Sequence, residues 1–172
     1  MRAHFVHVAC FIILSTVSAA GVFAQSEDKD PVAVVEIGGA MDWNVAGGAA
    51  AFGPDFAVEV TPIENWLELE MGISPTITHS STEWDTDLLF KKPWTLSRAA
   101  EFMCGLGPEW IHTRQGGKTS DSVGGEVIGD FMFWPTGKHV LGWYAEPGFS
   151  YDFGSGHQKS LGVAFGLLIG IR

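Results

Sequence analysis

The last segment of this chain alternates between bulky apolar residues and residues that are small at all but one position. The bulky positions are Leu161, Val163, Phe165, Leu167, Ile169 and Ile171, and the positions between them are Gly162, Ala164, Gly166, Leu168 and Gly170. Successive side chains of a β-strand point to opposite faces, so this period of two predicts a strand with one bulky and one small face. Earlier segments repeat the contrast, with Glu and Asp added to the small face. The chain is therefore expected to be all-β.

The first 24 residues have the features of a secretory signal peptide. Arg2 supplies a positive charge, and residues 8–17 form an apolar run too short to span a bilayer as a helix. Val22, Phe23 and Ala24 then place accepted residues before a cleavage site at Gln25. We expect a signal peptide over 1–24 and one mature domain over 25–172.

Charge and cysteine content exclude two further classes of protein. The formal net charge is −10, so there is no excess of basic residues to bind a nucleic acid. Cys104 is the single cysteine after the predicted cleavage site, which excludes an intrachain disulfide in the mature domain. The lysines and arginines of the mature chain are all expected in turns, loops or at a terminus.

Eight segments of period two follow one another along the mature chain. They cover residues 32–43, 56–61, 66–73, 83–90, 99–112, 123–134, 140–153 and 161–171. The second, fourth and sixth connections are expected to be short and to contain proline, with Lys91-Lys92-Pro93 ending the fourth segment; the others are longer and polar. This order predicts an eight-stranded antiparallel up-and-down barrel, in which Pro108 and Pro147 mark bulges or earlier strand ends.

The small face of these segments carries a set of acidic residues that the alternation places inside the barrel. They are Glu36, Glu59, Glu68, Glu70, Glu101, Glu109, Glu126, Asp130, Glu146 and Asp152. An eight-stranded barrel is nearly filled by its side chains, so like charges packed there need water or cations as partners. We expect a hydrated acidic lumen, with cations as partners and limited, porin-like passage of small cations as a further hypothesis.

Aromatic residues gather near the ends of the segments, which favours lipid outside the barrel. One rim is predicted at Trp43, Trp84, Trp110 and Tyr151, and the other at Trp66, Trp94, Trp134 and Trp143. Two levels of amphipathic rings are typical of membrane barrels, where they lie at the two interfaces. Together with the bulky outer face, they predict a transmembrane β-barrel.

The predicted signal, the eight segments, the aromatic rims and the apolar last strand resemble the small eight-stranded outer-membrane barrels of the OmpA/OmpX type, over nearly the full mature chain. The resemblance implies a place in the outer membrane of a Gram-negative cell envelope, contact with outer-membrane lipid, and insertion by the barrel-assembly machinery. That machinery usually reads a terminal aromatic residue, and this chain departs from the pattern by ending in Ile171-Arg172.

The fold does not by itself supply a function. We expect a non-enzymatic role in envelope structure or surface interaction, with no catalytic residues, metal site or cofactor. One alternative is a soluble periplasmic barrel, similar to a lipocalin, that binds an apolar ligand in its interior. Another is a membrane-embedded lipid-modifying enzyme that uses His112 with a nearby serine. His79, His112 and His157 lack the fixed spacing of metal ligands and are expected to be loop residues.

Overall fold

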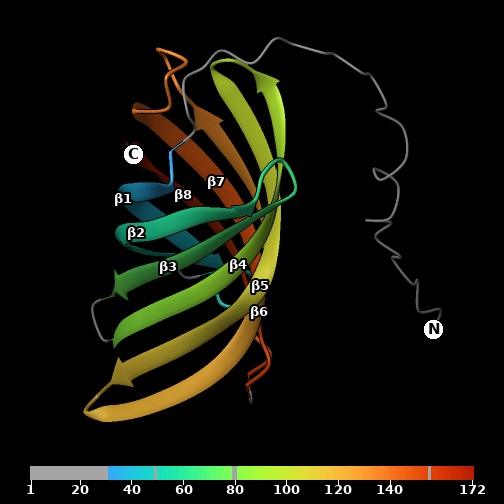
Figure 1. Ribbon diagram of the computed structural model, residues 1–172. Helices are drawn as coiled ribbons and strands as arrows, with labels where there is room; N and C mark the ends of the chain where they lie inside the picture. Colours follow the sequence, from blue (N-terminus) through green and yellow to red (C-terminus); the bar gives the residue numbers. More distant parts are fainter. Residues whose placement is uncertain (1–30, 49, 79–80, 155) are drawn as a thin grey trace, which may run out of the picture.

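The computed structural model describes residues 31–172 apart from 49, 79, 80 and 155, so the predicted signal peptide lies outside the described residues. The described strands are β1 (Ala33–Asn44), β2 (Ala50–Ile63), β3 (Leu67–Ile77), β4 (Ser81–Ser97), β5 (Ala100–Gln115), β6 (Lys118–Phe133), β7 (Leu141–Asp152) and β8 (Lys159–Ile171). Each pairs antiparallel with the next, and β1 pairs with β8, so the sheet closes into a barrel (Figure 1). The predicted eight-stranded up-and-down barrel is confirmed. Among the described residues, no helix is long and apolar enough to cross a membrane.

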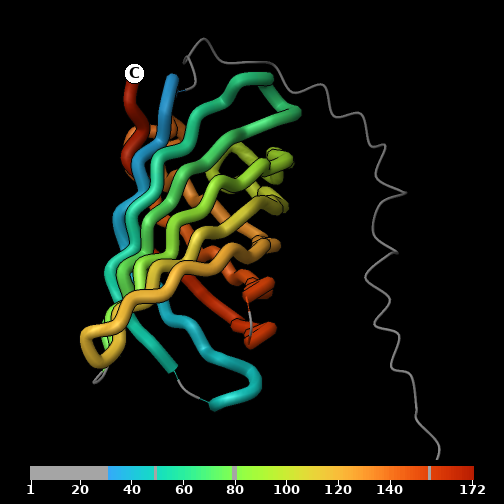
Figure 2. Tube along the Cα trace, turned by 90° about the horizontal axis from the view of Figure 1, so that it is seen from below, coloured from blue at the N-terminus to red at the C-terminus, as the bar shows by residue number. Residues whose placement is uncertain are grey.

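The two ends of the barrel are distinguished by the chain termini. Ala33 of β1 pairs with Ile171 of β8, and Figure 2 shows these blue and red ends side by side. We call this the terminal end. At the opposite, distal end Asn44 pairs with Ser160.

The alternation sorts large apolar side chains to the outside of the wall and acids to the inside. Leu106 is 63% exposed and Phe165 is 59% exposed on the outer surface, whereas Glu36 and Asp130 are 1% and 0% exposed. This is the reverse of a water-soluble barrel, whose apolar face points inward. The alternation in the sequence therefore corresponds to a barrel whose outer surface is covered by bulky apolar side chains.

β4 continues through Lys91-Lys92-Pro93 to Ser97, so the prediction that these residues end a strand is wrong. Pro93 pairs with Met103 of β5. Since β3 begins at Leu67, this part of β4 is paired with β5 alone among the described strands, and such an edge tolerates a residue without an N–H donor. Lys91 consequently lies inside the barrel, which also contradicts the prediction that basic residues occur only in turns, loops or at a terminus.

Pro108 and Pro147 mark neither bulges nor strand ends. Pro108 pairs with Gly125 of β6, and Pro147 pairs with Val163 of β8. On the other side of each proline the ladder skips the adjacent positions and resumes in the same register. The missing backbone N–H donor of each proline therefore interrupts the strand pairing only locally. The side chains of Pro108 and Pro147 point outward and are exposed.

The predicted alternation of short and long connections is also wrong. β5 and β6 are joined by Gly116 and Gly117 alone, whose φ angles of 57° and 78° form the tight turn that two-residue hairpins require. The connection at residues 134–140, expected to be short, is longer than this distal one. Residues expected in loops lie in strands instead, since β2 begins at Ala50 and β6 at Lys118.

Candidate functional site

The barrel interior contains three layers from the terminal end to the distal end. The terminal plug consists of Val34, Met103, Met132, Trp134 and Leu168. The lysine hub consists of Lys91 with Glu36, Glu59, Glu70, Asp130 and Glu146. The distal vestibule is lined by Asp42, Asp85, Asp87, Glu109 and Glu126. Each layer draws residues from several strands, so closure of the barrel assembles it.

The terminal plug is apolar and tightly packed. Met103, Met132 and Leu168 are fully buried and belong to the hydrophobic cluster of the interior. Trp134 belongs to it, at 1% exposed, so its predicted place at a membrane interface is wrong. Its position two residues beyond Met132 gives it the inward face, and a Cβ on Gly142 of β7 would lie 2.8 Å from the indole Cε3 atom. The absence of a side chain at Gly142 therefore gives the indole its space.

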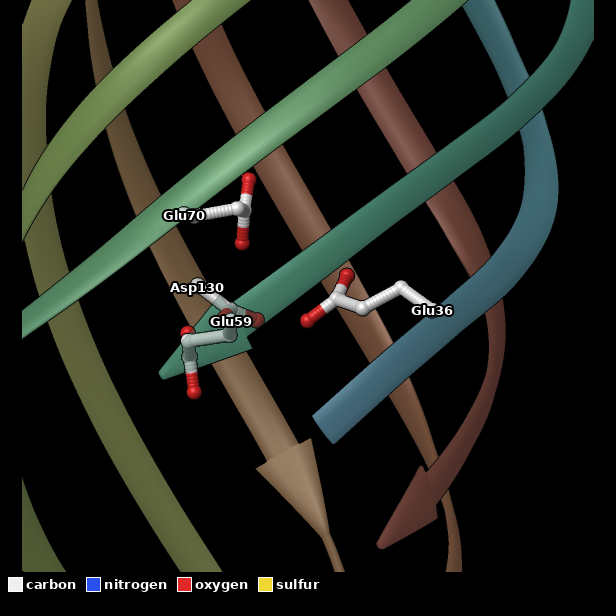
Figure 3. A group of neighbouring side chains, drawn as sticks. All are labelled: Glu36, Glu59, Glu70 and Asp130. Atoms are coloured by element: carbon white, nitrogen blue, oxygen red, sulfur yellow. The ribbon is translucent and has the colours of Figure 1, made fainter. Parts of the chain in front are cut away.

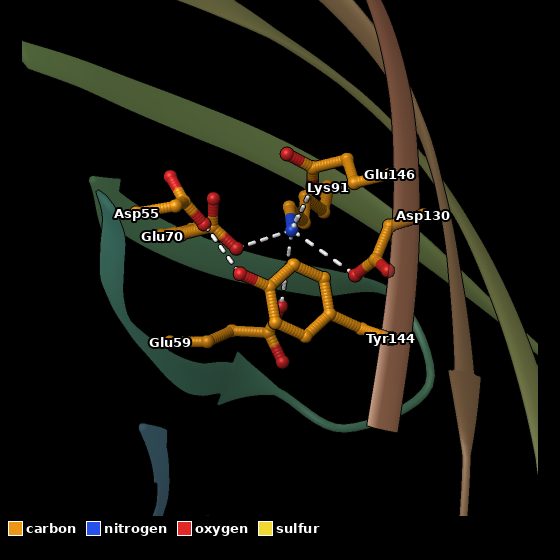
Figure 4. Close-up of polar contacts among 7 residues, drawn as sticks. All are labelled: Asp55, Glu59, Glu70, Lys91, Asp130, Tyr144 and Glu146. Carbon is orange, nitrogen blue, oxygen red and sulfur yellow. Dashed lines mark hydrogen bonds and ion pairs between the residues drawn. The ribbon is translucent and has the colours of Figure 1, made fainter. Parts of the chain in front are cut away.

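The lysine hub surrounds one ammonium group with carboxylates. Lys91 Nζ donates to Glu146 Oε2 at 2.8 Å and to Asp130 Oδ2 at 3.1 Å, and also donates to Glu70 (Figure 4). Glu59 Oε2 lies 3.6 Å away as a further ion pair. Removing charges from water is costly unless they are paired and hydrogen-bonded, and Lys91 supplies that pairing to acids from four strands.

Four hub acids come close enough together to resemble a metal site. Glu36, Glu59, Glu70 and Asp130 each place one carboxylate oxygen within 4.8 Å of the others (Figure 3). The ammonium of Lys91 contacts three of these four acids, so the protein supplies its own cation at this place. Lys91 also fits sterically, because it pairs with Gly105, where a Cβ would lie 2.9 Å from Lys91 Cγ.

A hydrogen-bonded group centred on Asp55 lies where the hub meets the vestibule, since Asp55, Glu70 and Glu146 also line the cavity of the vestibule. The hydroxyl of Tyr144 donates to Asp55 Oδ2, and Ser74 Oγ donates to Asp55 Oδ1 at 2.5 Å. Figure 4 shows the Tyr144 ring beside the Lys91 cluster. Sequence analysis missed Asp55 because the second segment was expected to begin at Phe56.

The distal vestibule encloses a cavity of about 60 Å³. None of the described residues that line it is basic. Three of its acids lie opposite glycines in the ladder, in the pairs Asp42–Gly162, Asp87–Gly72 and Glu109–Gly124. A Cβ on Gly72 would lie 2.6 Å from Asp87 Oδ2, and one on Gly162 would lie 2.7 Å from Asp42 Oδ1. The glycines thus let these carboxylates fold back against the wall.

The ten acids predicted for the lumen are distributed unequally. Five lie in the hub (Glu36, Glu59, Glu70, Asp130 and Glu146), two in the vestibule (Glu109 and Glu126), and Glu68, Glu101 and Asp152 are half-buried. Asp152 accepts a hydrogen bond from Gly154 N at 2.6 Å. Lys91, Asp85 and Asp87 were missing from the predicted set, although the alternation itself gives all three the inward face.

The other predicted rim aromatics lie on the outer surface. Trp43, Trp66, Trp84, Trp94, Trp110 and Trp143 are exposed, and Tyr151 is half-buried. At the terminal end, phenylalanines missed by sequence analysis extend the ring: Trp94, Phe102 and Phe131 are neighbours at centroid distances of 5.8 and 4.8 Å, and Phe133, Trp143 and Phe165 at 4.1 and 6.1 Å.

The histidine considered for an enzymatic site lies on the outer wall near the distal end. His112 Nδ1 is 2.7 Å from Asp121 Oδ1; the His112 side chain is half-buried and that of Asp121 is exposed. Among the hydrogen bonds of the described residues, none joins a serine to His112. His157 Nδ1 is 3.2 Å from the Tyr151 hydroxyl, and His79 lies outside the described residues.

Neither a protein-family model nor a curated protein matches the chain. Solved structures do match. Neisserial surface protein A has 12% identity and a TM-score of 0.64, covering 81% of this chain and 96% of that one. The attachment invasion locus protein Ail of Yersinia pestis has 10% identity and a TM-score of 0.57, covering 82% and 99%. The N-terminal barrel domain of Pseudomonas aeruginosa OprF has 12% identity and a TM-score of 0.52, covering 82% and 100%. The chain therefore has the fold of the small eight-stranded outer-membrane barrels.

Proposed function

We propose that this chain is an integral outer-membrane protein whose role is envelope structure or surface interaction rather than catalysis. The observation that carries the proposal is the sidedness of the wall: leucines, valines and phenylalanines cover the outside, and acids fill the inside. An exposed apolar surface that encircles a whole barrel is unfavourable in water and favourable in hydrocarbon. The lipid of the outer membrane is its partner in this proposal.

The aromatic rings support the same placement. Trp84 and Trp110 lie on adjacent strands toward the distal end, while Trp94 and Trp143 stack with phenylalanines toward the terminal end. Tryptophan is favoured at the level of lipid headgroups. In the proposal these two rings lie at the two interfaces, with the termini on the periplasmic side, after export by the predicted signal peptide and insertion by the barrel-assembly machinery.

A soluble carrier of an apolar ligand fits the interior poorly. Such a carrier needs an apolar cavity to receive the ligand. The apolar side chains inside this barrel form the packed terminal plug, and the cavity above them is lined largely by carboxylates. The lipocalin-like alternative is therefore not part of the proposal.

Passage of small cations and lipid modification also lack support. A path through the lumen would have to cross the terminal plug, in which Trp134, Met132 and Leu168 are buried. An enzyme acting on lipid through His112 would need a nucleophile in contact with that ring, and Asp121 is its partner here. We therefore propose a closed, non-enzymatic barrel.

A matched pair of leucines tests the membrane placement. Leu106 lies midway along β5 between Phe102 and Trp110, whereas Leu96 lies near the end of β4, and both are 63% exposed. In a bilayer, Leu106→Arg should cost ~2–4 kcal/mol and Leu96→Arg about 0–1 kcal/mol, measured by urea unfolding of protein refolded into phosphocholine vesicles. Equal, small costs would overturn the proposal, because water would then surround both positions.

A further inference from the structure

The distal vestibule combines enclosed space with carboxylates that, unlike the hub acids Glu70 and Glu146 at its border, form no ion pair with Lys91. Its cavity of about 60 Å³ has room for about four water molecules. Asp42, Asp85, Asp87, Glu109 and Glu126 contribute carboxylates to its lining. The ion pairs of the described residues give none of the five a basic partner.

Glu109 is the observation that points to a ligand. It is only 8% exposed, lines the cavity, and its Oε2 atom has no hydrogen-bond partner. Asp87 lines the same cavity, and its buried Oδ1 atom is likewise without a hydrogen-bond partner. A buried carboxylate oxygen with no donor is unfavourable, so a cation or its water would stabilise both groups.

The lysine hub shows how the chain itself supplies a cation to a cluster of acids in this barrel. There Lys91 brings a covalently attached ammonium within hydrogen-bond reach of Glu70, Asp130 and Glu146. The vestibule has a comparable set of acids and open space instead of a lysine. An exchangeable cation would complete it.

The spacing of the acids selects a hydrated ion. Among the described residues, the acids that converge within 4.8 Å are those of the hub, so the vestibule acids are too far apart to wrap a dehydrated ion together. Mg²⁺ typically keeps several of its waters and binds through one or two carboxylates. The glycines opposite Asp42, Asp87 and Glu109 hold the centre open for those waters.

We infer that the distal vestibule binds a hydrated divalent cation of the Mg²⁺ type. Glu109 and Asp87 offer the direct carboxylate ligands, and Asp42, Asp85 and Glu126 accept hydrogen bonds from its water. This site does not depend on whether a membrane surrounds the barrel. Its failure is therefore distinguishable from failure of the membrane placement.

Binding is tested with Mn²⁺, a paramagnetic substitute for Mg²⁺, on the folded full-length mature chain in a zwitterionic detergent that contributes no net charge. The free-ion electron paramagnetic resonance signal should fall as the ion binds, and excess Mg²⁺ should restore it. Glu109→Gln should weaken binding at least tenfold, and Asp87→Asn should weaken it similarly. Glu64→Gln, which removes one charge from the exposed turn after β2, should leave it unchanged.

Each variant is first checked for native fold by near-ultraviolet circular dichroism. Loss of a carboxylate that lacks a partner should leave the fold intact, so the comparison remains valid. The inference is overturned if the wild-type chain does not bind Mn²⁺, or if Glu109→Gln and Asp87→Asn bind it as tightly as the wild type. It is also overturned if Glu64→Gln weakens binding as much as Glu109→Gln, because the effect would then reflect net charge alone.

Discussion

The lysine hub and the distal vestibule contain similar acids in the same barrel and balance them differently. In the hub, Lys91 lies among Glu59, Glu70, Asp130 and Glu146, next to the packed terminal plug. In the vestibule, carboxylates surround a cavity with no basic side chain among its described lining residues. Where the interior is packed, the cation belongs to the chain, and where there is space, we infer that it comes from solvent.

The contrast has a physical cause in side-chain volume. Next to the hub, Met103, Met132 and Trp134 fill the lumen and leave little room for water. Charges there must pair directly, because the interior of a protein screens them poorly. Toward the distal end the bulky inward side chains give way to glycine and short acids such as Asp42, so water can enter.

Removing the hub cation should have the largest effect. Lys91→Met leaves several buried carboxylates without a partner and should lower the free energy of unfolding by about 3–5 kcal/mol, measured by urea unfolding of the refolded barrel. The control is Lys92→Met on the adjacent residue. Its Nζ donates to the Asn65 carbonyl oxygen at an exposed turn and lies 5.7 Å from the Trp94 ring, so its loss should cost about 1 kcal/mol or less.

Equal costs for the two lysine variants would contradict the hub as described. The charge removed is the same, and only the environment differs. A small cost at both positions would mean that water reaches Lys91 and that the hub resembles the vestibule.

Glycine-to-alanine substitutions should lower the free energy of unfolding more in the terminal plug than in the distal vestibule. We expect this difference to be smaller than the difference between the two lysine variants. Gly142→Ala places a methyl group against the Phe133 carbonyl and the Trp134 indole, and overpacking of this kind costs about 1–3 kcal/mol. Gly72→Ala meets the carboxylate of Asp87, which can swing into the cavity, so it should cost about 1 kcal/mol or less. The same unfolding experiment measures both. A costlier Gly72→Ala would show that the vestibule is as rigid as the plug.

The alternation of the sequence was enough to predict the fold and the face of most residues. Side chains such as Glu36 and Asp130 lie inside because strands have a period of two and because the bulky residues between them require the outside. The number of strands followed from counting the alternating segments. The pairing of β1 with β8 then closes the sheet into the barrel.

The errors concern where strands end. Lys91 lies two residues beyond Leu89 and Trp134 two beyond Met132, so both take the inward face once the strand or its alternation continues to them. Proline and clustered charge suggested an earlier end at Pro93, because sequence alone does not reveal that this stretch of β4 has an open edge. The proline and the clustered charges thus led to a wrong strand end, although the alternation gives Lys91 its inward face.

The composition of the hub was beyond sequence analysis. Lys91 contacts acids from β2, β3, β6 and β7, which come together only through the stagger of a closed barrel. Which acids share a height inside the lumen depends on the pairing register of every strand. That register is a property of the closed sheet rather than of any one segment.

The solvent outside the barrel is measured most directly by the reactivity of a thiol at Leu106. With Cys104 changed to Ser, Leu106→Cys and Leu96→Cys place single thiols at two equally exposed outer positions, for reaction with a charged, membrane-impermeant maleimide in phosphocholine vesicles. The account predicts that Leu106→Cys reacts at least tenfold more slowly than Leu96→Cys, and that urea unfolding removes the difference. Rapid reaction at both positions in intact vesicles would contradict it, because water would then cover the apolar wall.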